Sequence, residues 1–214
     1  MSQQFDRLIS SLVADLQPVQ RLTRRSGMAI ALGALVVSIS VTVFGIGLRP
    51  DVSTGQLDPV FLLSSGLFLL LAGASSFTVI ELSRPQVGGH RDGWIWAVAM
   101  TFLLPASAAL ISAISWFRGT VPFVDPEGVK CLAMGIALGM IVGLPLVFWL
   151  RKGAAISPER AGLLTGLAAG SSGIFAFALH CPHSDIAHIG LWHGLAVAVS
   201  ACFGRLVVPS LVRW

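Results

Sequence analysis

Residues 161–180 read AGLLTGLAAGSSGIFAFALH, a run of twenty residues without a single Asp, Glu, Lys or Arg. A helix needs about 20 apolar residues to cross the hydrocarbon core of a bilayer, and backbone polar groups in lipid must be satisfied within the segment itself. The run therefore predicts a transmembrane helix. Gly162, Gly166 and Gly170 form a row at four-residue spacing within it, a pattern that lets a second helix backbone approach closely in lipid.

Five more apolar stretches of similar length lie on either side of this run. The chain of 214 residues is 55% hydrophobic and only 11% charged, and its mean hydropathy is +0.83. Soluble domains carry about 25% charged residues. The composition therefore predicts an all-α, polytopic membrane protein with six transmembrane helices. Besides 161–180, the predicted spans are 27–48, 60–82, 94–116, 129–150 and 188–208.

The Lys and Arg residues predict how the chain is oriented. If the N-terminus is cytoplasmic, all fourteen except Arg49, Arg118 and Lys130 lie on the cytoplasmic side. Cytoplasmic loops are enriched in basic residues, so we expect both termini in the cytoplasm. The basic residues stand at span ends and not in one patch, and we therefore expect no direct binding to nucleic acid.

A second glycine row, formed by Gly135, Gly139 and Gly143, lies in the span 129–150. Glycine is common in this chain, with 23 residues, so composition alone is one explanation for the rows. Two rows on consecutive antiparallel spans nevertheless favour a close approach of the helix backbones. We therefore expect 129–150 to pack against 161–180 along these rows.

Two of the three cysteines stand at the same end of these neighbouring spans. Cys131 lies near the start of 129–150 and Cys181 follows 161–180, so the predicted topology puts both thiols on the outer side. Three interpretations stay open: two unrelated buried thiols, a structural disulfide, or a responsive pair that binds a metal or changes oxidation state. Cys202, well inside the span 188–208, is expected to be a small packed hydrophobic residue.

Neighbouring histidines favour the responsive pair. Four of the five histidines in the chain fall between residues 180 and 193. Thiolate with imidazole suits Zn, Cu or Cd, and a nearby imidazolium makes a thiol more reactive. The spacing matches no standard zinc motif, so we expect no obligatory cofactor but a soft metal ion held transiently at Cys131 and Cys181. The candidate metal ligands around Cys181 are His180, His183, Asp185 and His188.

The segment 1–26 is the one sizeable polar part of the chain, and we treat it as separate from a transmembrane domain of residues 27–214. An apolar stripe at helical spacing runs through it, formed by Phe5, Leu8, Ile9, Leu12, Val13 and Leu16. Such a stripe is typical of a helix on the membrane surface or of a helix that docks into the groove of a soluble partner. Both interpretations remain open from the residues alone.

Several function classes find no support in the sequence. No pair of carboxylates lies within a span, and we find neither a phosphate-binding loop nor a Gly-x-Ser-x-Gly nucleophile motif, so we do not expect an enzyme. A small membrane transporter or metal permease is the main alternative, although the span centres nearly lack the ionisable residues that transport usually requires. A purely structural membrane subunit is another.

Several stretches resemble the NrsF-type membrane anti-sigma factors. They are LISSLVADLQPV (8–19), Cys131 at the start of the fourth span, HCPH (180–183) and AHIGLWH (187–193). The resemblance extends over nearly the whole chain and six spans. It implies a multi-pass protein of the bacterial inner membrane whose cytoplasmic portion holds an ECF-type sigma factor.

The resemblance also implies roles for particular residues. Cys131 and Cys181 would be the outward sensors that register metal or oxidative stress and cause release of the sigma factor. Asp15, Leu16, Pro18 and Val19 would lie in the segment that contacts the sigma factor, and Leu8 and Leu12 of the apolar stripe would belong to the same partner-binding segment. The expected partners are therefore an ECF-type sigma factor and the lipid bilayer.

Overall fold

The computed structural model describes residues 2–14, 22–84, 113, 114, 116, 117 and 126–212. This part of the chain is all-helical and contains five helices long and apolar enough to cross a membrane, which correspond to five of the six predicted spans. The sixth, 94–116, lies almost entirely outside the described residues. The prediction of an all-α, polytopic membrane protein is thus confirmed.

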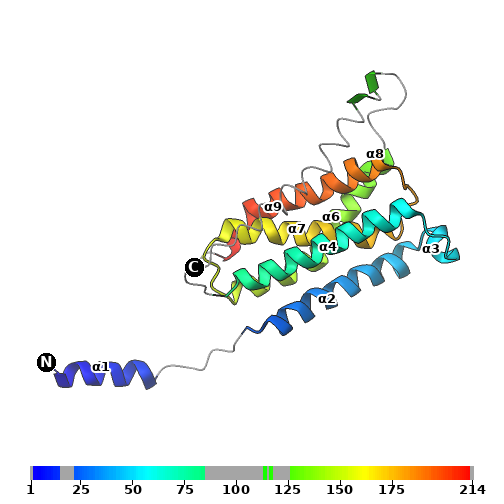
Figure 1. Ribbon diagram of the computed structural model, residues 1–214. Helices are drawn as coiled ribbons and strands as arrows, with labels where there is room; N and C mark the ends of the chain where they lie inside the picture. Colours follow the sequence, from blue (N-terminus) through cyan, green and yellow to red (C-terminus); the bar gives the residue numbers. More distant parts are fainter. Residues whose placement is uncertain (1, 15–21, 85–112, 115, 118–125, 213–214) are drawn as a thin grey trace.

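Figure 1 shows the described helices, coloured in the order in which they follow one another along the chain. The N-terminal helix α1 (Ser2–Ala14) precedes α2 (Arg24–Ser40), which continues into a π-helix, η1 (Val41–Ile46). Next come the short α3 (Pro50–Thr54) and the spanning helices α4 (Pro59–Leu82), α6 (Pro126–Arg151) and α7 (Pro158–Ala178). The last span consists of α8 (Ile186–His188), the π-helix η2 (Ile189–His193) and α9 (Gly194–Val212).

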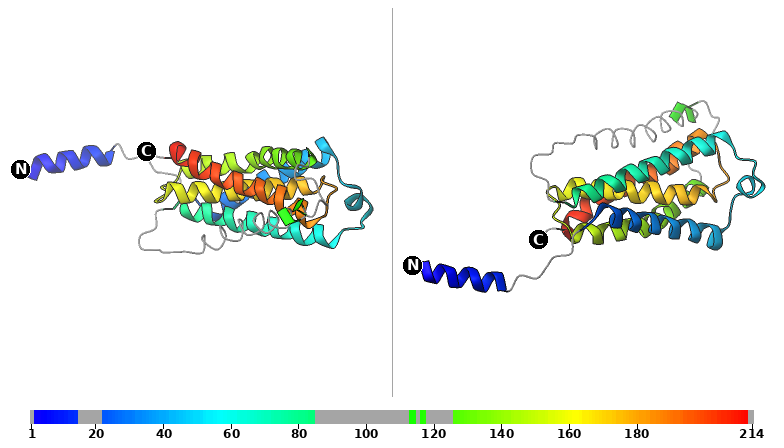
Figure 2. Two further views of the ribbon diagram at one scale, coloured as in Figure 1. Left: turned by 90° about the horizontal axis from the view of Figure 1, so that it is seen from above. Right: turned by 60° about the horizontal axis from the view of Figure 1, so that its bottom comes forward.

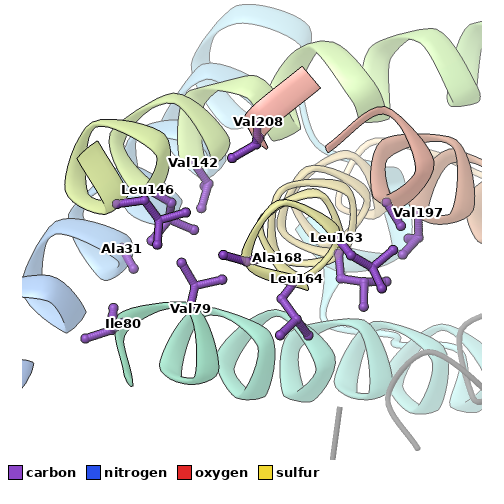
Figure 3. Close-up of a cluster of buried hydrophobic side chains, with 14 of the residues drawn as sticks. Ala31, Val79, Ile80, Val142, Leu146, Leu163, Leu164, Ala168, Val197 and Val208 are labelled. Carbon is purple, nitrogen blue, oxygen red and sulfur yellow. The ribbon is translucent and has the colours of Figure 1, made fainter. Parts of the chain in front are cut away.

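Helix α7 lies at the centre of the bundle. It contacts α4, α6 and α9. In an apolar stretch of 18 residues within α7, 89% of the residues are buried, whereas the corresponding share in the other spanning helices is 22–44%. Figures 1 and 2 show the neighbouring helices running alongside it. Most of the buried apolar side chains around it form the main core (Figure 3), whose members include Ala31, Val79, Ile80, Val142, Leu146, Leu163, Leu164, Ala168, Val197 and Val208.

The spanning helices begin at residues suited to that position. Proline follows the N-cap of both α4 and α7, at Pro59 and Pro158, where its missing N–H costs no helical hydrogen bond. Asp58 caps α4, because its carboxylate accepts a hydrogen bond from the Val60 N–H at 2.7 Å.

We call the end of the bundle where α6 begins and α7 ends the cysteine end, and the end where α2 begins the Arg24 end.

The glycine row of α6 faces α7, as expected. A Cβ atom on Gly139 would lie 2.5 Å from the carbonyl oxygen of Ala169, and one on Gly135 would overlap the side chain of Ile174. On the α7 side, Gly173 approaches the backbone of Gly135 and Gly139 just as closely. The two helix backbones therefore touch in a way that only very small residues permit.

The glycine row of α7, however, does not face α6, so that part of the expectation is wrong. Gly162, Gly166 and Gly170 lie against the backbone of α9, at Gly204, Ser200 and Val197. Residues four apart on an α-helix are rotated by about 40°, so a row at this spacing turns gradually around the helix. The row of α7 turns toward α9 and leaves Ala169 and Gly173 to contact α6.

Polar contacts join three helices at the Arg24 end. The Arg24 Nε atom of α2 lies 2.5 Å from Glu81 Oε1 near the end of α4. Just beyond α4, the Ser83 hydroxyl accepts a hydrogen bond from Trp149 Nε1 of α6 at 3.0 Å. Gly27 of α2 lies against the side chains of Ile80 and Trp149. The beginning of α2 is therefore in direct contact with the end of α6.

We predict that Gly139→Ala destabilises the protein by about 1–3 kcal/mol, because the added methyl group would push against the Ala169 carbonyl group. The thermal unfolding midpoint of the detergent-solubilised protein measures the effect. Gly33→Ala in α2 is the matched control, since, apart from its own neighbouring residues and helix backbone, no described atom lies within 4 Å of the position of its Cβ. It should leave the midpoint unchanged or raise it slightly. Equal midpoints for the two variants would contradict close packing of α6 on α7.

Candidate metal and thiol site

Two buried thiols meet at the cysteine end of the bundle. Cys131 lies in the first turns of α6, and Cys181 follows the C-terminal end of α7. Their side chains are 4% and 1% exposed, and the two sulfur atoms are 3.7 Å apart. The contact between α6 and α7 therefore brings together residues that are 50 positions apart in the chain.

Two histidines of the following helix complete the group. His188 Nε2 lies 3.7 Å from the Cys181 sulfur, and the rings of His188 and His193 meet edge to face with centroids 5.5 Å apart. The potential ligand atoms of Cys131, Cys181, His188 and His193 all lie within 4.8 Å of one another, and all four residues are buried. We call these four residues the inner group.

The π-helix η2 explains how His188 and His193 reach the same site. Residues five apart on a regular α-helix are rotated by about 140° and point in different directions. Between these two histidines the chain forms η2, whose wider turn brings residues five apart closer to the same face. Asp185 fixes the start of this helix, since its carboxylate accepts a hydrogen bond from the His188 N–H at 2.7 Å.

His193 is the residue that the sequence analysis left out of the candidate ligands. Its side chain is 2% exposed, and its Nε2 atom has no hydrogen-bond partner in the described part of the chain. The sequence did not indicate His193 as a ligand because it lies five residues after His188, a spacing that places the two side chains on different faces of a regular α-helix. The presence of four histidines between 180 and 193 was the one signal in the sequence that included it.

The other candidate ligands take different places. His180 lies outside the inner group, and its Nδ1 atom is 3.0 Å from the Gly47 carbonyl oxygen. His183 Nε2 is 2.5 Å from Glu127 Oε2, and the His183 ring lies 4.7 Å from that of His188. Together with Asp185 and His188, His183 forms a second, more exposed group, which we call the outer group.

Cys181 lies in the segment that connects α7 to α8, and its surroundings favour the thiolate form. Its pKa is lowered chiefly by the hydrogen bond with Cys131 and further by His188 and His193, although burial acts in the opposite direction. The thiolate is the form that binds metals and attacks oxidants. A buried site with two sulfurs and two imidazoles could hold a metal ion of the zinc class.

Arg49 fastens the loop that carries Cys181. Its guanidinium is 5% exposed, lies 2.5 Å from Asp51 Oδ1 and donates a hydrogen bond to the Ser184 hydroxyl at 2.8 Å. Its backbone N–H donates to the Leu179 carbonyl oxygen. The segment from 179 to 184 is thus held at both ends by a single residue from the loop after η1.

Cys202 does not have the environment that the sequence analysis predicts. Its side chain on α9 is exposed in the described part of the chain, whereas the preceding Ala201 is fully buried. Adjacent positions on a helix are rotated by about 100°, so Cys202 points away from the contact of α9 with α7. The prediction of a packed thiol is therefore wrong.

Comparison with known proteins decides the family. Residues 12–214 match the family described as NrsF, negative regulator of sigma F. The chain belongs to the NrsF family. This family consists of regulators and not of enzymes, which confirms the prediction that the chain is not an enzyme. No solved structure matches the chain.

Two relatives in the NrsF family align over nearly their full length. The chain is 28% identical to the probable anti-sigma-F factor NrsF of Azospira oryzae, over 97% of this chain and 98% of that protein. It is 30% identical to the anti-sigma-F factor NrsF of Caulobacter vibrioides, over 98% of this chain and 99% of that protein. An apolipoprotein N-acyltransferase of Neisseria meningitidis is 31% identical over 159 residues, but the aligned part covers only 27% of that enzyme.

We predict that a mild oxidant converts Cys131 and Cys181 into an intramolecular disulfide. The sulfurs need to approach only from 3.7 Å to about 2.05 Å, while Cys202 lies about two and a half helical turns beyond His193 on another face. Peptide mapping of the purified, oxidised protein by mass spectrometry identifies the linked pair. In Cys131→Ser, no intramolecular bridge should form. A bridge between Cys181 and Cys202 would contradict the described arrangement.

Proposed function

We propose that the protein is a membrane-bound anti-sigma factor that sequesters an ECF-type sigma factor through its N-terminal segment, residues 1–26. Release follows when Cys131 and Cys181 react with a metal ion or an oxidant. Membership of a family described as negative regulators of sigma F supports the regulatory role. The observation that carries the sensing step is the 3.7 Å separation of two buried thiols from different helices.

The proposed topology has six spans, with residues 27–214 forming a transmembrane domain of the bacterial inner membrane and both termini in the cytoplasm. The five candidate spanning helices and the apolar stretch 94–116 support this number. The excess of Lys and Arg on the N-terminal side supports the orientation. In this topology the inner group faces the periplasmic side, where metals and oxidants from outside arrive first.

The apolar face of α1 supports a docking role for the N-terminal segment. Leu8 and Leu12 are 55% and 62% exposed, and the other apolar side chains of this helix, Phe5, Ile9 and Val13, are also exposed. A single helix that presents such a stripe suits the groove of a soluble partner. Asp15, Leu16, Pro18 and Val19, the other proposed contacts, lie outside the described residues.

The chemistry of the thiol pair offers two ways to change the contact between α6 and α7. An oxidant that accepts two electrons and two protons leaves a disulfide, which shortens the distance between the sulfurs to about 2.05 Å. A metal ion instead replaces the thiol protons and holds both sulfurs. Either product differs from the free thiols in the helix arrangement that it favours, and such a difference is what a switch requires.

Helix α6 gives this change a physical path to the Arg24 end. It carries Cys131 near one end and Trp149 near the other. Trp149 donates a hydrogen bond to Ser83 and packs against Gly27 of α2. Arg24, which is paired with Glu81, is one of the last residues of the N-terminal segment. A shift of α6 against α7 would therefore act on the start of α2, from which the proposed sigma-binding segment extends.

We predict that Leu12→Asp abolishes repression, because the mutation would force a charge into the apolar groove of the partner. Co-purification of the sigma factor with full-length protein, together with expression of a sigma-dependent reporter, measures the effect. Ser10→Asp is the matched control, since this exposed residue lies about 160° around the helix from Leu12, and it should still repress. Full repression by a well-expressed Leu12→Asp variant would place the binding surface elsewhere.

We predict that Cys131→Ser and Cys181→Ser still repress but no longer respond to thiol-reactive metals or oxidants. The double variant should behave like either single variant, because a two-thiol device fails when one thiol is missing. Reporter expression with and without Cd²⁺ or a mild oxidant measures the response, and Cys202→Ser should respond like the unmodified protein. Normal induction in the double variant would refute the proposed sensor.

A further inference from the structure

The geometry of the inner group matches a four-coordinate metal site. With Zn–S bonds of about 2.3 Å and Zn–N bonds of about 2.0–2.1 Å, tetrahedral coordination separates two sulfurs by about 3.8 Å and a sulfur from a nitrogen by about 3.6 Å. The two sulfurs here are 3.7 Å apart, and the Cys181 sulfur is 3.7 Å from His188 Nε2. All four potential ligand atoms lie within 4.8 Å of one another.

His193 provides an independent observation that points to a ligand. Its Nε2 atom is buried without a hydrogen-bond partner among the described residues, and the residue is 2% exposed. Buried polar atoms are nearly always paired, because leaving one unpaired costs free energy. Its ring lies beside that of His188, and its potential ligand atom lies within 4.8 Å of those of Cys131 and Cys181. A bound cation would give this nitrogen a partner.

We infer that Cys131, Cys181, His188 and His193 form a closed, tetrahedral site for a divalent ion of the zinc class, Zn²⁺ or Cd²⁺. This inference rests on the proposed function and names the ligand set of its sensor. Binding exchanges the thiol protons for the ion, and two thiolates balance its double positive charge. Because four protein ligands fill the coordination sphere, no position is left for a reactive water, and the site suits a regulatory ion.

The outer group supplies a route into this buried site. It shares His188 with the inner group and adds His183 and the exposed Asp185. An ion from solution can contact His183 and Asp185 first and then pass to the thiolates by exchange of ligands around His188. Sulfur ligands hold Zn²⁺ and Cd²⁺ more firmly than carboxylate does, so the transfer proceeds inward.

The ligand set can be tested with Co²⁺, which replaces Zn²⁺ and absorbs visible light strongly only in tetrahedral sites. We expect the reduced, full-length protein in detergent to bind one Co²⁺ with a tetrahedral spectrum and a thiolate charge-transfer band. Added Zn²⁺ or Cd²⁺ should displace it. His193→Gln should lower the Co²⁺ affinity by at least about tenfold and change the visible bands, while the thiolate band remains.

Two further variants separate loss of a ligand from loss of folding. His193→Cys supplies a new ligand at the same position, so it should restore the tetrahedral spectrum with a stronger thiolate band. His180→Gln is the matched control, because His180 contacts the Gly47 carbonyl oxygen and lies outside the inner group, and it should bind Co²⁺ like the unmodified protein. An octahedral spectrum, or identical binding by His193→Gln and the unmodified protein, would overturn the inference.

The reporter assay distinguishes this failure from failure of the proposed function. If His193→Gln binds metal unchanged but the cysteine variants lose induction, the sensor is a two-thiol device and the tetrahedral site is refuted alone. If the unmodified protein binds Co²⁺ tetrahedrally but represses no sigma factor, the site stands and the anti-sigma role is refuted. Induction by Cd²⁺ that is weakened in His193→Gln and retained in His180→Gln supports both.

Discussion

The contact of α7 with α6 and α9, backbone against backbone, is the constraint on which the rest of the structure depends. Apolar side chains gain little from each other in lipid, so helices in a membrane associate through close van der Waals contact between small residues. Gly135, Gly139 and Gly173 provide that contact on one side of α7, and Gly162 and Gly166 provide it on the other. A larger side chain at the first contact would separate α6 from α7 and, with them, Cys131 from Cys181.

The thiol and imidazole groups meet because three separate parts of the chain come together at the cysteine end of the bundle. Helix α6 supplies Cys131, the segment after α7 supplies Cys181, and the wide turn of η2 turns two histidines toward both sulfurs. Arg49 holds the loop of Cys181 in position through Ser184 and Leu179. Buried polar groups are costly unless they are paired, and within this group the buried Nε2 atom of His193 has no hydrogen-bond partner among the described residues.

Helix α6 relates this site to the opposite end of the bundle. Its backbone contacts α7 along the glycine row, and its Trp149 side chain contacts Ser83 and Gly27 at the Arg24 end. Closely packed helices shift as units, because interiors without voids do not deform continuously. In the proposed mechanism, binding at the thiols changes how α6 lies on α7, and the start of α2 experiences that change. The coupling then requires only one pair of helices with two stable arrangements.

The sequence by itself determined the all-helical membrane class, the five described spans and the placement of Cys131 and Cys181 at the same end of the bundle, because hydropathy and span length are local properties. The resemblance of a few short stretches also predicted the NrsF family correctly. Only the tertiary structure decided that His193 joins the thiols while His180 turns to Gly47, and that the glycine row of α7 faces α9. These features depend on the rotation of each helix about its axis and on the π-turn of η2, which are set by packing between segments distant in the chain and leave no periodic signal in the sequence.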